Sequence, residues 1–190
     1  SIAMMVGASS HSQTDREQHD YYATEPIALE KFLDAYENRD KSVLRRHIWE
    51  PACGEGHLSE VLLERGFQVR STDLIDRGYG EGGVDFLQLT SDIGYTDILT
   101  NPPFRLAEEF VRHGLKLSER VIIFQRIHFL ESQKRKELFR DCPLRYVYIH
   151  SSRVGTAMNA DFERYKAKAM CYAWYIFERD FKGETVVRWI

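Results

Sequence analysis

Cysteines are few in this sequence, and long apolar runs are absent from it. The three cysteines, Cys53, Cys142 and Cys171, are widely spaced and form neither a zinc-binding pattern nor a disulfide framework. We therefore expect a protein of the reducing cytoplasm that holds no metal. No apolar run approaches the length of a membrane span and no secretory signal is visible, so we expect no membrane partner.

The composition is typical of a globular protein. Hydrophobic residues make up 43% of the 190 residues and charged residues 29%. This length suggests one domain with a full hydrophobic core. Residues 1–20 are polar and almost without an apolar pattern, so we expect a flexible tail there and a single domain over residues 21–190.

The net charge of −3 is unevenly distributed along the chain. Residues 120–170 hold 11 Lys and Arg against 5 Asp and Glu, a local charge of +6, while the remainder of the chain carries −9. A basic segment on an acidic protein is typical of a surface that holds a polyanion by phosphate contacts. The alternative is a solvated helix face followed by a loop.

Strand-like and helix-like segments alternate along the chain. Thr24 and Pro26 mark the start of an amphipathic helix, which ends in the charged stretch 37–41. The later segments are strands at 47–50, 67–74, 97–100, 121–125 and 146–150, and helices from residue 58 to the glycine at 66, at 106–117 and at 131–140. Residues 151–169 show no strong pattern, and the strand-like runs 170–177 and 185–190 predict a terminal antiparallel hairpin.

Such alternation predicts a parallel sheet with helices on both faces. Ligands of these sheets bind at the carboxyl ends of the strands, near the point where the strand order reverses. The residues to inspect for chemistry therefore follow directly after Glu50, Thr72 and Thr100.

A glycine turn follows the strand at 47–50 and opens the next helix. Gly54 and Gly56 let the backbone approach a ligand closely, because they carry no Cβ. Glu50 ends the strand just before this turn. Asp73 ends the next strand, about twenty residues after the glycines, where a carboxylate can accept two ribose hydroxyls.

Two further features favour an aminoacyl nucleoside over a dinucleotide. Asp85-Phe86 lies in the next connection, where the carboxylate can accept from an adenine amino group while the ring packs on the base. A dinucleotide site would usually have a third glycine early in the helix, but the chain continues as His57-Leu58-Ser59. A glutamate at the strand end also suits an ammonium group better than phosphates.

The segment Asn101-Pro102-Pro103-Phe104 follows the strand at 97–100 and indicates chemistry on a planar amino group. Such a group is a poor nucleophile because its lone pair is delocalised. The side-chain oxygen of Asn101 and the carbonyl of Pro102 can each accept one amino hydrogen, which favours a tetrahedral nitrogen and shares its developing positive charge. Pro102 and Pro103 stiffen the loop, and Phe104 can stack on a flat substrate. The alternative is a plain turn after a strand.

Together these motifs resemble those of class I S-adenosylmethionine-dependent methyltransferases. The resemblance implies a Rossmann-like α/β fold with a seven-stranded, mostly parallel sheet. It also implies S-adenosylmethionine as cofactor and the following cofactor-binding residues: Tyr22, Thr24, Glu50, Pro51, Ala52, Cys53, Gly54, Gly56, Asp73, Leu74, Asp85 and Phe86. The family usually has proline directly after the threonine equivalent to Thr24, whereas this chain has Glu25 between Thr24 and Pro26.

The catalytic residues implied by the resemblance are Asn101, Pro102, Pro103 and Phe104, as in adenine-N6 DNA methyltransferases. The same motif occurs in RNA methyltransferases and in glutamine-N5 protein methyltransferases. The second half of the chain, including Lys182-Gly183-Glu184 and Arg188-Trp189-Ile190, resembles small phage and mobile-element enzymes of the DNA type. A cofactor-binding module without activity is a third reading, which the intact motif at 101–104 disfavours.

Residues of the basic second half are candidates for contact with nucleic acid, for which DNA is the preferred reading. They are Lys134, Arg135, Arg153, Phe162, Arg164, Tyr165 and Lys166. Other notable side chains have simpler readings: we expect Cys53 to be a packing residue, His57 to lie on a helix surface, and Trp174 and Trp189 to be core.

Overall fold

The computed structural model of the chain describes residues 22–90, 96–154, 156–158, 162 and 170–190. The predicted tail at 1–20 and the candidate contacts Arg164, Tyr165 and Lys166 lie outside these residues. The main sheet has seven strands in the order β3-β2-β4-β5-β8-β6-β9. The prediction of a seven-stranded, mostly parallel sheet is confirmed, because among these strands only β8 runs antiparallel to its neighbours.

The first half of the sheet follows the predicted alternation of strand and helix. Its elements are β2 (His47–Glu50), α3 (His57–Glu64), β3 (Gln68–Ser71), β4 (Thr96–Thr100), α4 (Ala107–Leu117) and β5 (Arg120–Arg126). Two short 3-10 helices interrupt the connections, η1 (Phe86–Gln88) and η2 (Phe104–Leu106). Strand β2 pairs with β3 on one side and with β4 on the other, so the strand order reverses at β2.

The predicted terminal hairpin is wrong. The second half contains η3 (Ile127–Leu130), α5 (Gln133–Asp141), β6 (Leu144–Ile149), β8 (Tyr172–Glu178) and β9 (Val186–Trp189). Strand β8 inserts between β5 and β6, and β9 pairs in parallel with the far side of β6. The burial of each strand explains the placement: residues 172–177 are all buried, as in a central strand, whereas β9 alternates between half-buried and exposed, as at an edge.

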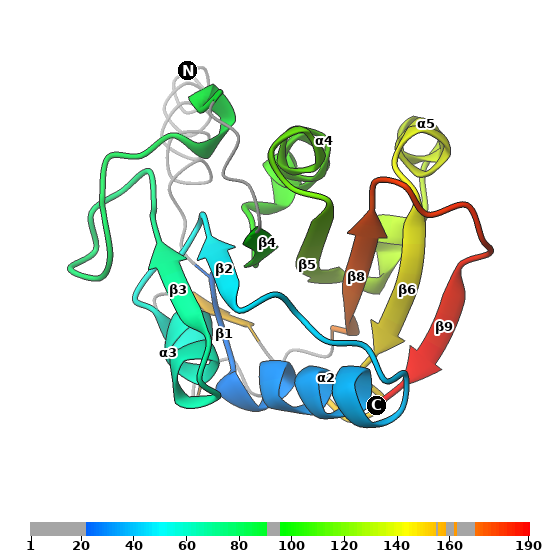
Figure 1. The fold of residues 1–190 in the computed structure, drawn as a ribbon, viewed down its shortest axis with the longest axis horizontal. Helices are drawn as coiled ribbons and strands as arrows, with labels where there is room; N and C mark the ends of the chain where they lie inside the picture. The colour runs from blue at the N-terminus through cyan, green and yellow to red at the C-terminus, as the bar shows by residue number, and fades with distance from the viewer. Residues whose placement is uncertain (1–21, 91–95, 155, 159–161, 163–169) are drawn as a thin grey trace, which may run out of the picture.

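Helices cover both faces of the sheet, as predicted (Figure 1). Helices α4 and α5 lie on one face, and α3 and α2 (Pro26–Asn38) lie on the other. Pro26 stands at the start of α2, where its missing N–H has no helical partner to lose. One stripe of α2, from Ala28 to Tyr36, is buried against the sheet.

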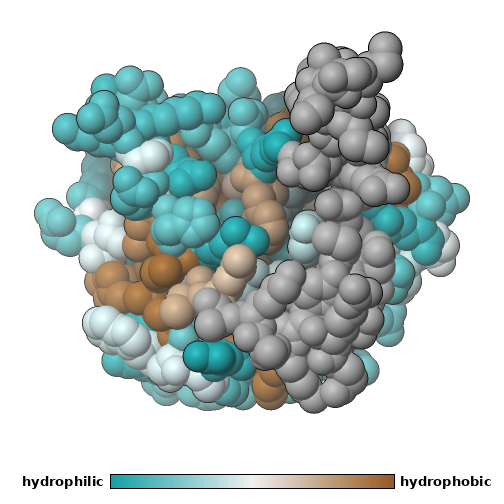
Figure 2. All heavy atoms as spheres, turned by 180° about the vertical axis from the view of Figure 1, so that it is seen from behind, coloured by the Kyte–Doolittle hydropathy of each residue, from teal (hydrophilic) through white to brown (hydrophobic). Residues whose placement is uncertain are grey.

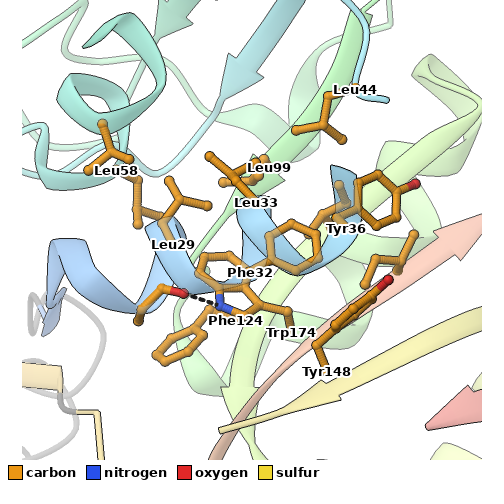
Figure 3. Close-up of a cluster of buried hydrophobic side chains, with 14 of the residues drawn as sticks. Leu29, Phe32, Leu33, Tyr36, Leu44, Leu58, Leu99, Phe124, Tyr148 and Trp174 are labelled. Carbon is orange, nitrogen blue, oxygen red and sulfur yellow. Dashed lines mark hydrogen bonds between the residues drawn. The ribbon is translucent and has the colours of Figure 1, made fainter. Parts of the chain in front are cut away.

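Of the two tryptophans that we expect in the core, one is buried and the other is exposed. Trp174 is fully buried and stacks on Phe32 at 5.3 Å between ring centroids, and its Nε1 donates to the Ala28 carbonyl at 3.1 Å (Figure 3). Trp189 is 63% exposed, so its predicted core position is wrong. The side chain points out of the edge strand β9, which has no hairpin partner to cover it.

A second, two-stranded antiparallel sheet joins segments far apart in the sequence. Strand β1 (Tyr22–Thr24) pairs with β7 (Thr156–Met158), with Thr24 opposite Thr156. The stretch 151–169, which shows no pattern in the sequence, therefore contains a strand. Because β1 leads directly into α2, this pairing holds the entry to the helix against the later part of the chain.

Candidate functional site

A cavity of about 620 Å³ lies at the carboxyl ends of the first strands of the sheet. Twenty-four residues line it: Tyr22, Ala23, Thr24, Glu50, Pro51, Ala52, Cys53, His57, Leu58, Asp73, Leu74, Ile75, Arg77, Val84, Asp85, Phe86, Leu87, Asn101, Pro102, Pro103, Phe104, Arg105, Leu106 and Phe110. All four predicted catalytic residues line it, as do all predicted cofactor-binding residues except Gly54 and Gly56. The site therefore lies where the strand order reverses, as the sequence predicts.

The rim of the cavity is partly apolar. Leu74 and Leu106 line it and remain 51% and 38% exposed, which is high for large aliphatic side chains. Figure 2 shows the face behind that of Figure 1, where hydrophobic residues form a patch bordered by hydrophilic ones. A cavity with apolar walls and a few placed polar groups is the usual form of a small-molecule site.

The two glycines of the turn contact neighbouring groups of the protein and do not line the cavity. The Gly54 N–H donates to Asp73 Oδ2 at 2.8 Å. Gly56 has a φ of 91°, and a Cβ on it would lie 2.5 Å from the ring of Tyr79. The close backbone approach that the sequence indicates is thus real, but it is made toward Tyr79, and it holds the segment after Asp73 against the turn.

Three carboxylates, Glu50, Asp73 and Asp85, form what we call the carboxylate end of the cavity. Asp73 Oδ1 accepts from the Ile75 N–H at 3.0 Å, and Asp85 Oδ1 accepts from the Leu87 N–H at 3.1 Å. Both side chains are therefore oriented by the backbone of their own turns. Phe86, beside Asp85, is buried and packs edge-on against Trp49 at 5.1 Å.

Glu50 is the buried member of the carboxylate end. Its Oε1 accepts from the Thr100 hydroxyl at 3.1 Å, and its Oε2 is buried without a partner among the described residues. Burial raises the pKa of Glu50 well above its ordinary value, and the charge of Asp73 raises it further. The Thr100 hydroxyl and the backbone N–H groups of Ala52 and Asn101 oppose this rise by donating to the carboxylate. A cationic ligand group at this position would compensate the buried charge.

Cys53, in the glycine turn, has the properties of a packing residue. The side chain is buried, and its Sγ lies 3.6 Å from the carbonyl oxygen of Tyr79. Burial raises the pKa of this thiol to about 12. The thiol is therefore protonated at neutral pH, and it is a poor nucleophile.

Asn101, Pro102, Pro103 and Phe104, with Gln125 and Arg126 behind them, form what we call the asparagine end. The Asn101 side-chain nitrogen donates to the Tyr22 carbonyl at 3.1 Å and to the Thr24 hydroxyl at 2.9 Å. Its Oδ1 is buried and has no partner among the residues that the structure describes. Burial of an acceptor without a hydrogen bond costs folding free energy. A ligand group that donates a hydrogen bond to Oδ1 is the best explanation for its position.

The next two groups of the asparagine end also have defined neighbours. The Pro102 carbonyl accepts from Gln125 Nε2 at 3.4 Å. The Phe104 ring lies 5.3 Å from that of Tyr22 at an interplanar angle of 41°, and Arg126 Cζ is 4.6 Å from its centroid. Gln125 and Arg126 are absent from the sequence prediction, although they end the strand beside Asn101, and that shared edge is the signal that could have found them.

A second cavity of about 140 Å³ adjoins the asparagine end, and Phe104 and Arg105 line both. Its remaining lining residues are Glu108, Glu109, Phe129, Ser132, Lys134 and Arg135. Two candidate nucleic-acid contacts, Lys134 and Arg135, therefore meet here. Arg135 is already engaged, because it donates to the Glu131 carbonyl at 3.1 Å and lies 4.9 Å from the Phe129 centroid.

The other candidate contacts lie elsewhere. Phe162 lies 5.5 Å from His57 between ring centroids but does not itself line the cavity. His57 itself is half-buried and lines the cavity, rather than lying on an open helix surface as we expect from the sequence. Arg153 is exposed and lines neither cavity.

Two features, a metal-binding cluster and a membrane-spanning helix, are absent from the described part of the chain. Over residues 22–90, 96–154, 156–158, 162 and 170–190, no group of three or more His, Cys, Asp or Glu side chains is placed to hold a metal ion. Within the same ranges, no helix is both long enough and apolar enough to cross a bilayer.

Comparison with known proteins identifies the fold. No family model matches the chain, and no curated protein matches it. Among solved structures it is similar to a protein named as an RNA methyltransferase from Pyrococcus horikoshii, with a TM-score of 0.57 and 17% identity over 80% of this chain and 82% of that one. It is also similar to an S-adenosylmethionine-dependent methyltransferase from Anabaena variabilis, with a TM-score of 0.54 and 12% identity over 87% and 90% of the two chains.

A third similar structure is the methyltransferase subunit of a type I restriction-modification system from Streptococcus thermophilus. The TM-score is 0.59, with 11% identity over 88% of this chain and 47% of that one, so the chain spans about half the length of this subunit. The chain thus has the Rossmann-like fold of class I methyltransferases. At these identities the likeness concerns the fold, and the activity has to be argued from the site.

Proposed function

We propose that this protein transfers a methyl group from S-adenosylmethionine to the exocyclic N6 amino group of adenine in DNA. The observation that carries the proposal is the Oδ1 of Asn101, which is buried beside the Pro102 carbonyl on the wall of the large cavity and has no partner among the described residues. These two acceptors match the two hydrogens of a planar amino group. Phe104 adds an aromatic face at the same end of the cavity.

The residues of the carboxylate end fit the cofactor by their chemistry. Glu50 has a buried oxygen without a partner, which suits the ammonium group of the methionine part. Asp73 can accept the ribose hydroxyls, and Asp85 can accept from the adenine amino group while Phe86 packs on the base. The cavity volume of about 620 Å³ lies within the range of about 300 to 1,000 Å³ usual for small-molecule sites.

The asparagine end would do the positioning in the methyl transfer. When bound, S-adenosylmethionine supplies a methyl group whose C–S bond breaks as the N–C bond forms, and the amino group loses one proton to solvent. Asn101 Oδ1 and the Pro102 carbonyl each accept an amino hydrogen, which turns the nitrogen lone pair out of conjugation and shares its growing positive charge. Gln125 steadies the Pro102 carbonyl from behind, at 3.4 Å.

Charge and shape at the asparagine end favour a nucleic acid as the acceptor. Lys134 is exposed beside the second cavity, where three cations, Arg105, Lys134 and Arg135, outnumber Glu108 and Glu109. Residues 120–170 carry a net charge of +6. These cations can contact the phosphates that flank a base held at Phe104. Adenine in a duplex has to be extruded to reach the pocket, at a cost of a few kcal/mol, which single-stranded DNA avoids.

Two other acceptors present the same planar amino chemistry, namely an RNA base and a protein glutamine. Because the similar structure from Pyrococcus horikoshii is named as an RNA methyltransferase, the experiment below includes RNA as an acceptor. A cofactor-binding module without activity is disfavoured by the unpartnered Asn101 acceptor, because such a module would have no use for it.

The decisive experiment is transfer of a labelled methyl group from S-adenosylmethionine to adenine-containing DNA, to RNA and to protein. We expect label in DNA, as N6-methyladenine after nucleoside digestion. We expect none in DNA whose deoxyadenosine is replaced by deoxyinosine, which has no amino group at C6. Label that appears only in RNA or in protein would reassign the acceptor. Tight cofactor binding by calorimetry without label in any acceptor would contradict the enzymatic proposal.

A further inference from the structure

We propose that Thr24 is a positioning residue, which together with the Tyr22 carbonyl sets the orientation of the Asn101 carboxamide. This inference rests on the proposed function, because it names the group that prepares the acceptor of that reaction. The sequence places Thr24 among the cofactor-binding residues, and the observed contacts give it a different partner. Its hydroxyl oxygen accepts from Asn101 Nδ2 at 2.9 Å.

The orientation of the Asn101 carboxamide follows from the chemistry of its neighbours. The Tyr22 carbonyl, 3.1 Å away, can only accept a hydrogen bond, so the group that faces it has to be the NH₂. The Thr24 hydroxyl can accept the second amide hydrogen. With both hydrogens engaged on the β1 side, Oδ1 is turned the other way, where it is buried without a partner.

This orientation decides whether Asn101 can assist an amino substrate. With Oδ1 toward the substrate, the carboxamide accepts one amino hydrogen. With the carboxamide flipped, two NH₂ groups face each other, and the Tyr22 carbonyl faces an oxygen. The flip therefore replaces the bond to the Tyr22 carbonyl by an oxygen–oxygen repulsion, and the loss of a bond in a buried place is costly. The Thr24 hydroxyl, which can also donate, contributes by anchoring the carboxamide in the orientation that the Tyr22 carbonyl selects.

The strand that carries these two acceptors is itself held in place. Thr24 is 2% exposed, and its backbone lies opposite Thr156 in the pairing of β1 with β7. The Thr156 hydroxyl is 2.8 Å from the Tyr172 hydroxyl at the start of β8. A continuous set of contacts thus runs from the main sheet through β7 and β1 to Asn101, which is 77 residues away from Thr24 in the sequence.

The first test compares Thr24→Val with Thr24→Ser in steady-state methylation of DNA. Valine keeps the shape of threonine but loses the hydroxyl, so we expect kcat to fall about tenfold, with KM for DNA and Kd for S-adenosylmethionine unchanged within about twofold. Serine retains the hydroxyl, and we expect it to restore kcat to within about twofold of the native value. A raised cofactor Kd with an unchanged kcat would overturn the proposal and return Thr24 to the cofactor.

A matched control removes a threonine hydroxyl outside the cavity. Thr185 Oγ1 donates to the Leu144 carbonyl at 2.7 Å, on the β6–β9 side of the sheet. Thr185→Val therefore also loses one hydrogen bond of a threonine hydroxyl, at an exposed position, and we expect no change in kcat. If it lowers kcat as much as Thr24→Val does, the effect is a general loss of stability and the proposal fails.

The second test does not depend on turnover. The chain has three asparagines, so the Asn101 carboxamide can be assigned in protein labelled with ¹⁵N at asparagine by its absence in Asn101→Ala. We expect both of its protons to exchange slowly with water in the native protein, and one to exchange at least about tenfold faster in Thr24→Val. Equal exchange in the two proteins would overturn the positioning role, whereas slow exchange without methylation of any acceptor would remove the proposed function alone.

Discussion

The two ends of the cavity are held by hydrogen bonds of different range. At the asparagine end, the partners come from distant parts of the chain: Tyr22 and Thr24 hold Asn101, and Gln125 holds Pro102. At the carboxylate end, Asp73 and Asp85 bond to backbone groups only two residues further on, in addition to the Gly54 contact. Glu50, which accepts from Thr100, is the member of that end with a distant partner.

This difference separates two ways of preparing a site. Asp73 and Asp85 of the carboxylate end are oriented by turns that can form locally, whereas Glu50 depends on β4 beside it. The asparagine end depends on β1, β4 and β5 being correctly placed together, so its geometry is a property of the whole fold. Long-range support of this kind is what holds a reacting group within a fraction of an ångström.

The largest expected effects come from one substitution at each end of the cavity. They test whether catalysis and cofactor binding can be lost separately. Asn101→Ala removes the unpartnered acceptor, so we expect kcat to fall about 100-fold or more while the cofactor Kd stays within about twofold. Asp73→Ala removes a charged acceptor of the carboxylate end, so we expect the cofactor Kd to rise about tenfold or more. Calorimetry and single-turnover methylation measure the two quantities independently.

The control for this pair is Asp73→Asn, which retains one of the two oxygens that accept from the Gly54 and Ile75 N–H groups. We expect it to lower the melting temperature less than Asp73→Ala does and still to weaken the cofactor. The comparison fails if Asn101→Ala loses the cofactor, or if Asp73→Ala lowers kcat at saturating cofactor as much as Asn101→Ala does.

A smaller effect concerns the buried charge of Glu50. Because its folded pKa is raised, the free protein loses stability as the pH rises through that value, and a cationic ligand should bind better as Glu50 ionises. We expect Glu50→Gln to weaken the cofactor about tenfold at high pH, to abolish the rise of affinity with pH, and to raise the melting temperature of the free protein.

Calorimetry in buffers of different ionisation enthalpy measures the proton that Glu50 releases on binding. In the native protein we expect release below the raised pKa of Glu50, and in Glu50→Gln we expect none. A pH-dependence of affinity that persists in Glu50→Gln would assign the titration to another group.

Local patterns explain why the first half of the fold is predictable from the sequence. Between residues 47 and 126, the strands and helices are signalled by their own periodicity, and Pro51, Gly66 and Pro102 mark the ends of β2, α3 and β4. The positions of Glu50, Asp73 and Asn101 follow from those boundaries, because the carboxyl ends of parallel strands meet at one edge. The predicted site residues that line the cavity together are therefore mostly those whose positions depend on neighbouring strands.

Long-range pairings explain the errors. Nothing within 170–190 states that β8 pairs with β5 and β6, so two adjacent strand-like runs look like a hairpin, and Trp189 looks like core. The buried run 172–177 against the alternating residues of β9 is the one local clue to their different places. Likewise Thr24 reads as a cofactor residue, because its contact with Asn101 spans 77 positions.

The smallest expected effect lies beside the asparagine end, in the second cavity. Lys134 is exposed there, whereas Arg135 is bonded to the Glu131 carbonyl and stacked on Phe129. We expect Lys134→Ala to raise KM for DNA about threefold and to reduce the slope of log affinity against log salt by about one, with kcat unchanged. The exposed Lys182, in the connection from β8 to β9, is the matched control, and Lys182→Ala should leave both quantities unchanged.

Arg135→Ala completes this comparison, because it should act through stability instead of affinity. Loss of the Phe129 contact and of the bond to the Glu131 carbonyl should lower the melting temperature, with a salt slope close to the native one. If Arg135→Ala reduces the salt slope and Lys134→Ala does not, then the bonded arginine is the phosphate contact. The strand would in that case lie along Phe129 rather than past Lys134.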